Sequence, residues 1–348
     1  MVGYRPAVSG FVSYSYGKKV DMVAKVNMTY MKAITDDFGI WQHSKGETID
    51  RARGYALDDS ARALIVYILA GDMKRAKACF NYLATSQKGT GFVGFFDKDH
   101  LPLDDESSLD AYGLAMWALA FAMTHGLEEK AASRIFQRAT RFNTVRDLPI
   151  RTQAYLLMAF TILGDAQHAS IYAGNLNRAF DADLGWFEDY LRYANAVLPW
   201  SLIEYSRRFG SSPEIDAMIC TCIATLETYC RIGILPAPIG NHSWQRIGDP
   251  KRDIYGQQPI DAGFMVLMYL GAYEYFGDEQ YRDLARDWFS WFSGNNIYNQ
   301  TLIREDGACA DGLDEPWRWG NGISDNYGSE STIMYLWSEI MMKRELNT

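Results

Sequence analysis

The chain has 348 residues and a hydrophobic content of 48%, which is enough apolar material for a large core. Its formal net charge of −9, without a basic stripe, argues against nucleic acid or an anionic membrane as the main partner. Residues 1–18 lack the layout of a secretory signal, no apolar run is long enough to span a bilayer, and the odd set of five cysteines does not indicate a disulfide framework. We therefore expect a cytoplasmic protein.

Helical patterns, with apolar residues at the 3.6-residue spacing, follow one another along the chain. Short breaks follow the second, fourth, sixth, eighth and tenth patterns, and glycine stops such as Gly71, Gly164 and Gly277 mark them. Such short breaks predict antiparallel pairs of helices. The twelve predicted helices span 20–35, 58–70, 72–87, 107–125, 127–142, 147–163, 164–178, 188–209, 211–231, 259–277, 279–294 and 324–344.

Longer loops precede most of the even-numbered helices, and they lie at 36–57, 88–106, 179–187, 232–258 and 295–323. If successive helices run up and down, every even-numbered helix begins at the same end of the molecule, where the long loops also gather. The even-numbered helices are the more apolar ones, so we place them on the inside.

These features predict an all-α fold, an (α/α)6 toroid of six helical hairpins with small loop strands at one end. No linker separates two parts of the chain. We therefore expect one domain that spans residues 1–348, with residues 1–19 as an N-terminal arm.

Each even-numbered helix opens on polar side chains. Asp58 or Asp59 alone is explained as a helix cap, because an Asp side chain accepts hydrogen bonds from the free N–H groups of a first turn. Capping does not explain the second of these two residues, nor Asp110, Asp261 and Glu330, which follow other residues that can cap. In the toroid these acids would line one funnel at the positive ends of the helix dipoles, where negative charge is stabilised.

Such a funnel suits glycosyl transfer to water or phosphate. An inverting hydrolase needs one carboxylic acid to protonate the leaving oxygen and a second carboxylate, about 6.5–9.5 Å away, to activate water. We expect Asp59 or Asp110 to be the acid and Glu330 or Glu188 to be the base. Adjacent Asp58 and Asp59 do not supply both roles, because their side chains diverge on a helix.

The expected substrate site combines carboxylates for sugar hydroxyls with aromatic rings that cover the apolar face of a sugar. A phosphorylase would also need a phosphate site, for which Arg62, Arg151 and His242 are the candidates. The expected binding residues are Tyr55, Asp58, Arg151, Gln153, Trp186, Asp189, His242, Trp244, Gln257, Gln258, Asp261, Trp317, Trp319, Asn326 and Tyr327.

Two other classes of function fit the same fold. A sugar epimerase or isomerase would need a pair of histidines in the pocket, and the five histidines are scattered along the chain. A non-catalytic glycan-binding partner of a glycosyltransferase would keep the aromatic residues without two acids at a catalytic separation. The scattered histidines also lack the spacing of zinc ligands, so we expect no metal and no cofactor.

Motifs in several parts of the chain form a recognisable set, and they lie at 55–64, 186–188, 193–196, 238–241, 257–262, 311–313 and 328–332. Together they resemble the six-hairpin glycosidase-like domains that occur alone or fused to glycosyltransferases in bacteria and archaea. The resemblance implies the same toroid, an oligosaccharide or glycoside as substrate, and a functional link to a glycosyltransferase. The sequence departs from the family pattern at Ser60, Asp261 and Tyr327, and these departures imply a shifted specificity or lost catalysis.

Overall fold

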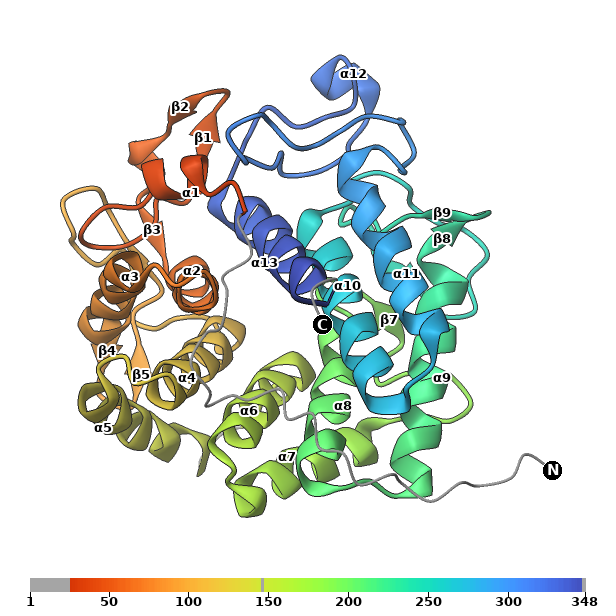
Figure 1. Ribbon diagram of the computed structural model, residues 1–348, viewed down its shortest axis with the longest axis horizontal. Helices are drawn as coiled ribbons and strands as arrows, with labels where there is room; N and C mark the ends of the chain where they lie inside the picture. Colours follow the sequence, from red (N-terminus) through yellow and green to blue (C-terminus); the bar gives the residue numbers. More distant parts are fainter. Residues whose placement is uncertain (1–25, 145–146, 346–348) are drawn as a thin grey trace.

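Six helices form a closed inner ring. The computed structural model describes residues 26–144 and 147–345, so the predicted arm at 1–19 lies outside the described residues. Each inner helix packs against the next, and the last packs against the first (Figure 1). In ring order the inner helices are α2 (Leu57–Leu69), α4 (Leu109–Thr124), α6 (Ile150–Leu163), α8 (Val197–Phe209), α10 (Pro259–Phe276) and α13 (Ser329–Glu345).

An outer helix packs on each inner helix. On α13 this is the short helix α1 (Thr29–Ala33). Tight turns join each of the other inner helices to its outer partner, and Gly164 and Gly277 end α6 and α10 in the left-handed conformation, with φ of 73° and 69°. The other outer helices are α3 (Met73–Ser86), α5 (Glu129–Thr140), α7 (Ala166–Ala179), α9 (Pro213–Tyr229) and α11 (Glu279–Ser290).

The distribution of apolar residues explains the two rings. The inner helix α10 is buried all round from Pro259 to Ala272, because it contacts neighbours on every side. The outer helix α5 buries only Ala132, Ile135, Phe136 and Ala139, which lie on one stripe at helical spacing. The prediction of an (α/α)6 toroid is confirmed.

The strands are short and belong to the loops that precede inner helices. Each pair is antiparallel, as in β3 against β6, where Tyr55 lies opposite Phe96. The pairs among the described residues are β1 (Ser44–Lys45) with β2 (Thr48–Ile49), β3 (Tyr55–Ala56) with β6 (Phe95–Phe96), β4 (Gln87–Lys88) with β5 (Gly91–Phe92), β7 (Tyr190–Leu191) with β10 (Gln245–Arg246), and β8 (Arg231–Ile232) with β9 (Leu235–Pro236).

Several predicted boundaries are wrong. The helix predicted at 188–209 begins only at Val197, because the preceding residues form β7 and a turn in which Ala194 takes a φ of 50°. The helix predicted at 324–344 begins at Ser329, since the Asp311 carboxylate accepts a hydrogen bond from the backbone N–H of Gly328 and holds the approach non-helical. Of the helix predicted at 20–35, only α1 lies in the described part of the chain.

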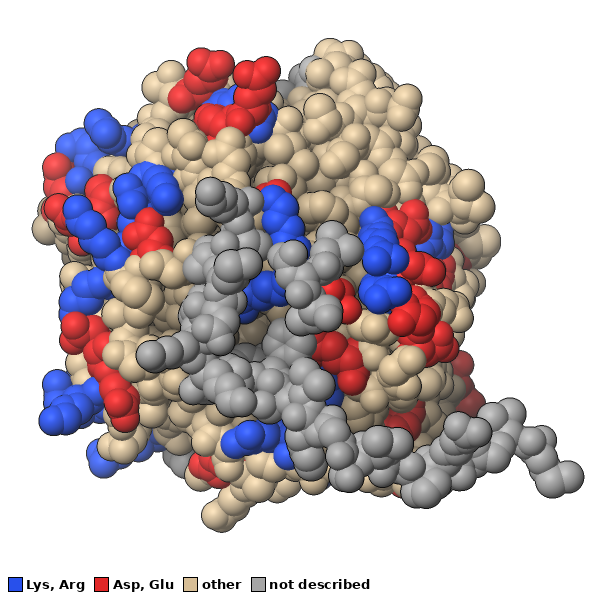
Figure 2. Space-filling model, in the orientation of Figure 1, with Lys and Arg blue, Asp and Glu red and all other residues tan. Residues whose placement is uncertain are grey.

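The long loops also hold one more short helix, α12 (Pro316–Trp319), and the 3₁₀ turn η1 (Arg51–Arg53). The 3₁₀ turns η2 (Arg141–Thr144) and η3 (Trp291–Ser293) directly follow α5 and α11. Within residues 26–144 and 147–345, every helix is too short or too polar to cross a membrane. On the face shown in Figure 2, basic and acidic side chains are interspersed around the rim.

Candidate functional site

A buried arginine joins the beginnings of α2 and α13. Arg62 is 2% exposed, and its guanidinium lies 2.9 Å from Asp58, 3.2 Å from Asp59 and 2.7 Å from Glu330. Ser329 completes the group by donating a hydrogen bond of 2.8 Å to Asp59. No side chain caps α2, so the capping role considered for Asp58 and Asp59 is wrong, and both acids hold Arg62 instead.

Burial governs the protonation of this cluster. It raises the pKa of Asp59 well above its ordinary range, with a further contribution from the nearby negative charge of Asp58. Burial also raises the pKa of Glu330, although the positive charge of Arg62 opposes the shift. The Glu330 side chain is 31% exposed. Glu330 is therefore the acid of this cluster that combines a raised pKa with access from solvent.

A second buried arginine organises the beginnings of α6 and α8. Arg151 is 4% exposed, and it donates hydrogen bonds to the backbone oxygen of Tyr193 at 2.6 Å, to Glu188 at 2.6 Å and to Asn195 at 3.1 Å. Its guanidinium also lies over the Tyr193 ring, 4.9 Å from the ring centre. Two of the three acceptors, Tyr193 and Asn195, belong to the 190–196 loop, and Glu188 lies just before it. Arg151 therefore fixes the position of that loop.

Asp110 connects this second cluster to α4. Ser108 caps α4 through the Ala111 N–H, which leaves the Asp110 side chain free for other contacts. One of its oxygens accepts a hydrogen bond of 2.7 Å from the Thr152 hydroxyl, and the other accepts one from the Tyr193 hydroxyl. Asp110 therefore accepts a hydrogen bond from a hydroxyl group on each of its oxygens.

Two buried groups experience the charges of both clusters. The pKa of the Tyr155 phenol is raised by burial and then by Asp110, while Arg62 and Arg151 lower it. The Asp261 carboxyl is 6% exposed and neither oxygen has a well-formed hydrogen bond, although the nearby backbone N–H of Ala194 lowers its pKa. Burial outweighs this effect and raises the pKa of Asp261 to about 7.

Since Arg62 and Arg151 both act on Tyr155, the two arginine clusters lie in one region at the beginnings of the inner helices. Arg151 lowers the pKa of Asp261 and Glu330 raises it, although these two residues belong to different clusters. The arrangement therefore brings Asp58, Asp59, Asp110, Glu188, Asp261 and Glu330 together from five elements of the chain.

Other expected binding residues lie wholly or partly in the core, and their direct contact with a substrate stays a prediction. Tyr55 is fully buried and donates to Asp36, Trp186 is fully buried, and Gln257 accepts from Trp291. Asp59, Arg151 and Asp261 are also buried, and the first two bond to neighbouring chain segments. Gln153 is half-buried and donates to the backbone oxygen of Leu148.

A cavity of about 220 Å³ lies beside the beginning of α10 and includes three of the expected residues, His242, Gln257 and Gln258. His242 lies 3.2 Å from Asp314. Asp311 also lines this cavity, and it accepts hydrogen bonds from Ser331 and from Asn326, another expected residue.

The expected aromatic residues do not form one platform. Trp317, on α12, is 76% exposed, while Trp244 packs near Tyr193 with ring centres 5.9 Å apart. Tyr327 stacks on Arg304, 4.7 Å away, outside the inner ring. Asp189 is exposed beside β7, and the Trp319 side chain lies outside the described residues.

Within the described part of the chain, two groups of side chains have the composition of a cation site. The ligand atoms of Asp58, Asp59 and Glu330 lie within 4.8 Å of one another, but the Arg62 guanidinium bonds to all three and supplies the positive charge. The other group is His242 with the acids at 314 and 315. The expectation of no metal stays a prediction.

Four residues that were not expected at the site lie among the expected ones. Tyr193 contacts Asp110, Asn195 contacts Arg151 and Asp311 contacts Asn326, while Tyr155 lies among the charges of Asp110 and the two arginines. Tyr193, Asn195 and Asp311 stand inside the motifs that carry the family resemblance, which is the signal that identifies them in the sequence.

The ring of six hairpins, with acids and arginines at the beginnings of the inner helices, defines the six-hairpin glycosidase-like fold. No protein-family model matches the sequence, and no curated protein is similar to it in sequence. Solved structures with the same fold are enzymes that act on sugars, among them epimerases, an isomerase, a cellulase and mannanases.

Three of these structures illustrate the likeness. A sugar epimerase from a ruminal bacterium has a TM-score of 0.73 at 14% identity, with 92% of this chain and 97% of that chain covered. The cellobiose 2-epimerase from Spirochaeta thermophila has a TM-score of 0.68 at 16% identity, with coverage of 92% and 94%. A cellulase of C. cellulolyticium in complex with cellobiose has a TM-score of 0.59 at 9% identity, with coverage of 91% and 90%. At these identities the likeness shows the fold.

Proposed function

We propose that the protein is a carbohydrate-active enzyme that cleaves a glycosidic bond of an oligosaccharide or glycoside with two of its carboxyl groups. The observation that carries this proposal is the contrast between Glu330 and Asp110. Both are partly exposed acids at the beginnings of different inner helices. The pKa of Glu330 is raised by burial, while Asp110 accepts a hydroxyl hydrogen bond on each oxygen.

This contrast assigns the two roles. A carboxyl group with a raised pKa keeps its proton nearer to neutral pH, so Glu330 protonates the leaving glycosidic oxygen. Asp110, an acceptor on both oxygens, takes a proton from the water that attacks the anomeric carbon. The assignment reverses the expected base role of Glu330 but retains the inverting mechanism, in which acid and base stand about 6.5–9.5 Å apart.

The pairing of Asp59 with Glu330 as acid and base has no support. Ligand atoms of the two carboxyl groups lie within 4.8 Å of each other, and Arg62 bonds to both. Asp59 is also only 4% exposed. Too little room remains between them for a sugar and a water molecule, so we assign Asp59 to the positioning of Arg62.

Water is the proposed acceptor in preference to phosphate. Arg62 and Arg151 are both buried and already bonded to carboxylates. His242 lies between Asp314 and Glu315, which disfavour an anion. The residues considered for a phosphate site are therefore committed to other partners.

A second candidate function is sugar epimerisation or isomerisation, and the position of two histidines favours it. His242 lines the cavity beside α10, and Asp311 lines the same cavity. Asn326 bonds to the Asp311 carboxylate and lies 2.8 Å from Nδ1 of His43. Two histidines thus lie in the surroundings of one acid, although they are far apart in the sequence.

One experiment separates these functions. The protein is incubated with a panel of oligosaccharides and nitrophenyl glycosides in deuterated buffer, with and without phosphate, and the products are followed by ¹H NMR. Hydrolysis gives a new reducing sugar of inverted anomeric configuration, phosphorolysis gives a sugar 1-phosphate, and epimerisation gives a new aldose that has incorporated deuterium.

Formation of the hydrolysis product supports the leading proposal. Binding without any turnover would instead favour a glycan-binding partner of a glycosyltransferase. The family resemblance extends the proposal to a substrate that such a glycosyltransferase makes.

A further inference from the structure

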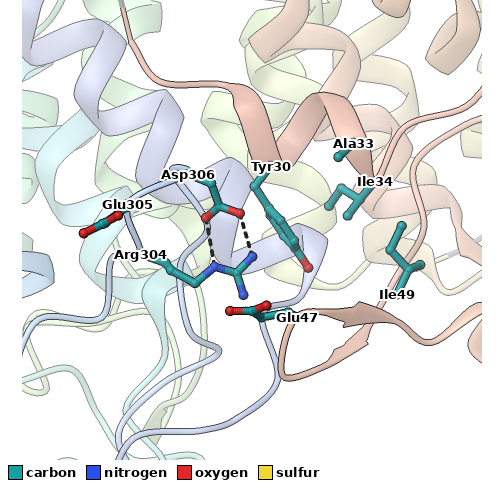
Figure 3. Close-up of a pocket in the computed structure, with 8 residues that line it drawn as sticks. All are labelled: Tyr30, Ala33, Ile34, Glu47, Ile49, Arg304, Glu305 and Asp306. Carbon is teal, nitrogen blue, oxygen red and sulfur yellow. Dashed lines mark hydrogen bonds and ion pairs between the residues drawn. The ribbon is translucent and has the colours of Figure 1, made fainter.

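A cavity of about 570 Å³ lies outside the inner ring, between α1, β2 and the loop around residue 305 (Figure 3). One wall is apolar and consists of Ala33, Ile34 and Ile49. The opposite wall is charged. The cavity lies beside the short outer helix α1, and among the described residues the outer ring leaves room there.

The cavity is separate from the candidate active site. Tyr30 and Arg304 form part of its wall, and they hold the turn that leads to Glu330. The Tyr30 hydroxyl donates a hydrogen bond of 2.7 Å to the backbone oxygen of Tyr327. The guanidinium of Arg304 lies between the rings of Tyr30 and Tyr327, 4.8 Å and 4.7 Å from their centres.

The charged wall has unfilled hydrogen-bonding capacity. Asp306 accepts from Nε and Nη2 of Arg304, at 2.9 Å and 2.7 Å, but Nη1 is buried without a partner. Figure 3 shows Glu47 on the side of the guanidinium opposite Asp306, with no bond joining Glu47 to Arg304. A buried donor without an acceptor indicates a place for a group that is absent from the protein itself.

We infer that this cavity binds a neutral sugar. Once the exposed Glu47 side chain rotates enough to admit a hydroxyl group between it and Arg304, that hydroxyl accepts from Nη1 of Arg304 and donates to the carboxylate of Glu47. The apolar wall covers the C–H face of the sugar ring. The volume is sufficient for a mono- or disaccharide, and the site stands independently of the reaction at Glu330.

The charges exclude the two alternative ligand classes. An anion would be bound by Arg304 but repelled by Glu47, Glu305 and Asp306. An amine would be bound by the acids but would leave Nη1 of Arg304 without an acceptor. Only a ligand with groups that both donate and accept satisfies this wall.

Methyl NMR tests the inference on the full chain. The protein is labelled at isoleucine methyl groups and titrated with glucose, mannose, galactose and cellobiose, and separately with inorganic phosphate and putrescine. We expect saturable shifts of the Ile34 and Ile49 methyl signals with at least one sugar. The signals of Ile171 and Ile234, which are exposed elsewhere at 51% and 87%, serve as internal controls.

Glu47→Ala is the test variant, because Glu47 is exposed and its loss leaves the fold intact. The loss of a hydrogen bond to a charged group weakens sugar binding about tenfold or more. Asp37→Ala, at an exposed acid outside the cavity, leaves it unchanged. The inference is overturned if no sugar shifts Ile34 and Ile49, if phosphate or putrescine shifts them instead, if the control isoleucines shift equally, or if Glu47→Ala binds as tightly as the natural chain.

Discussion

The Nη2 atom of Arg62 lies 2.7 Å from Oε2 of Glu330, so the first and the last helix of the inner ring are joined by an ion pair at the candidate site. The same guanidinium holds Asp58 and Asp59. Three acidic side chains lie close together, and the positive charge of one buried arginine offsets the repulsion between them. Two consequences follow for stability and for catalysis.

Arg62→Met should destabilise the protein strongly. The variant leaves three neighbouring carboxylates without their cation, and removal of one partner of a buried ion pair costs about 3–5 kcal/mol. Urea unfolding followed by circular dichroism measures the loss. Arg62→Lys is the control, because it keeps the charge but not the three simultaneous contacts. Its free energy of unfolding should lie between those of the natural chain and of Arg62→Met. A methionine variant as stable as the natural chain would show that Arg62 does not compensate these acids.

Glu330→Gln should abolish most of the turnover on an accepted glycoside. The amide keeps the shape of the side chain but has no acidic proton, so the rate should fall about 10²–10⁴-fold. The melting temperature should change little, because Arg62 retains Asp58 and Asp59. Sugar binding, measured by tryptophan fluorescence, should survive.

Asp58→Asn is the matched control for that variant, since Asp58 bonds to the same arginine and is similarly exposed, at 33% against 31%. We expect it to keep more activity than Glu330→Gln. Equal losses in the two variants would assign both acids to the positioning of Arg62 and remove Glu330 from the reaction.

Tyr193→Phe should reduce turnover without unfolding the protein. The variant removes the hydroxyl that donates to Asp110 but keeps the ring that packs under Arg151. One hydrogen bond contributes about 0.5–1.5 kcal/mol, so we expect a loss of up to about tenfold. Turnover equal to that of the natural chain would show that the hydrogen bond from Tyr193 to Asp110 does not contribute to the reaction.

Asp261→Asn should stabilise the protein, and more so as the pH rises. Burial raises the pKa of Asp261 from 3.8 to about 7, so between these values the folded state binds a proton that the unfolded state has lost. Stability of the natural chain therefore falls as pH rises through this window. The asparagine variant lacks this cost, which amounts to at most about 4 kcal/mol for a shift of this size.

Urea unfolding of both chains at intervals from pH 5 to pH 8 tests this prediction. The advantage of Asp261→Asn should grow up to about pH 7 and then level off. Arg151, Glu330 and Cys230 lie near enough to Asp261 to interact with its charge, so the profile is compared with that of Glu330→Gln. A difference independent of pH would show that Asp261 stays charged in the folded protein.

The helices were predicted well because their ends and their apolar stripes depend on residues that are close together in the sequence. Gly164 and Gly277 end helices through their own backbone conformation, and the stripe of α5 needs only its own residues. The helix predicted at 188–209 failed for the opposite reason. Its first part pairs with β10, far along the chain, and no local pattern contains that partner.

The candidate site was harder to predict, since burial depends on distant contacts. The sequence indicated the acids at the beginnings of the inner helices, and Asp58, Asp110 and Glu330 do lie there. It did not show that Trp186 would be enclosed by the fold. The pairing of Arg62 with Glu330 joins residues from opposite ends of the chain, so it follows only from ring closure.

Ring closure also means that the candidate site is completed only at the end of the synthesis of this chain. The helix α13 carries Glu330 and packs between α2 and α10, which are both made earlier. Until α13 leaves the ribosome, Arg62 faces its two aspartates alone and the apolar sides of α2 and α10 are uncovered. A nascent chain that lacks α13 therefore has an incomplete site and exposes apolar surface. We expect chaperones at the ribosome exit to bind this surface.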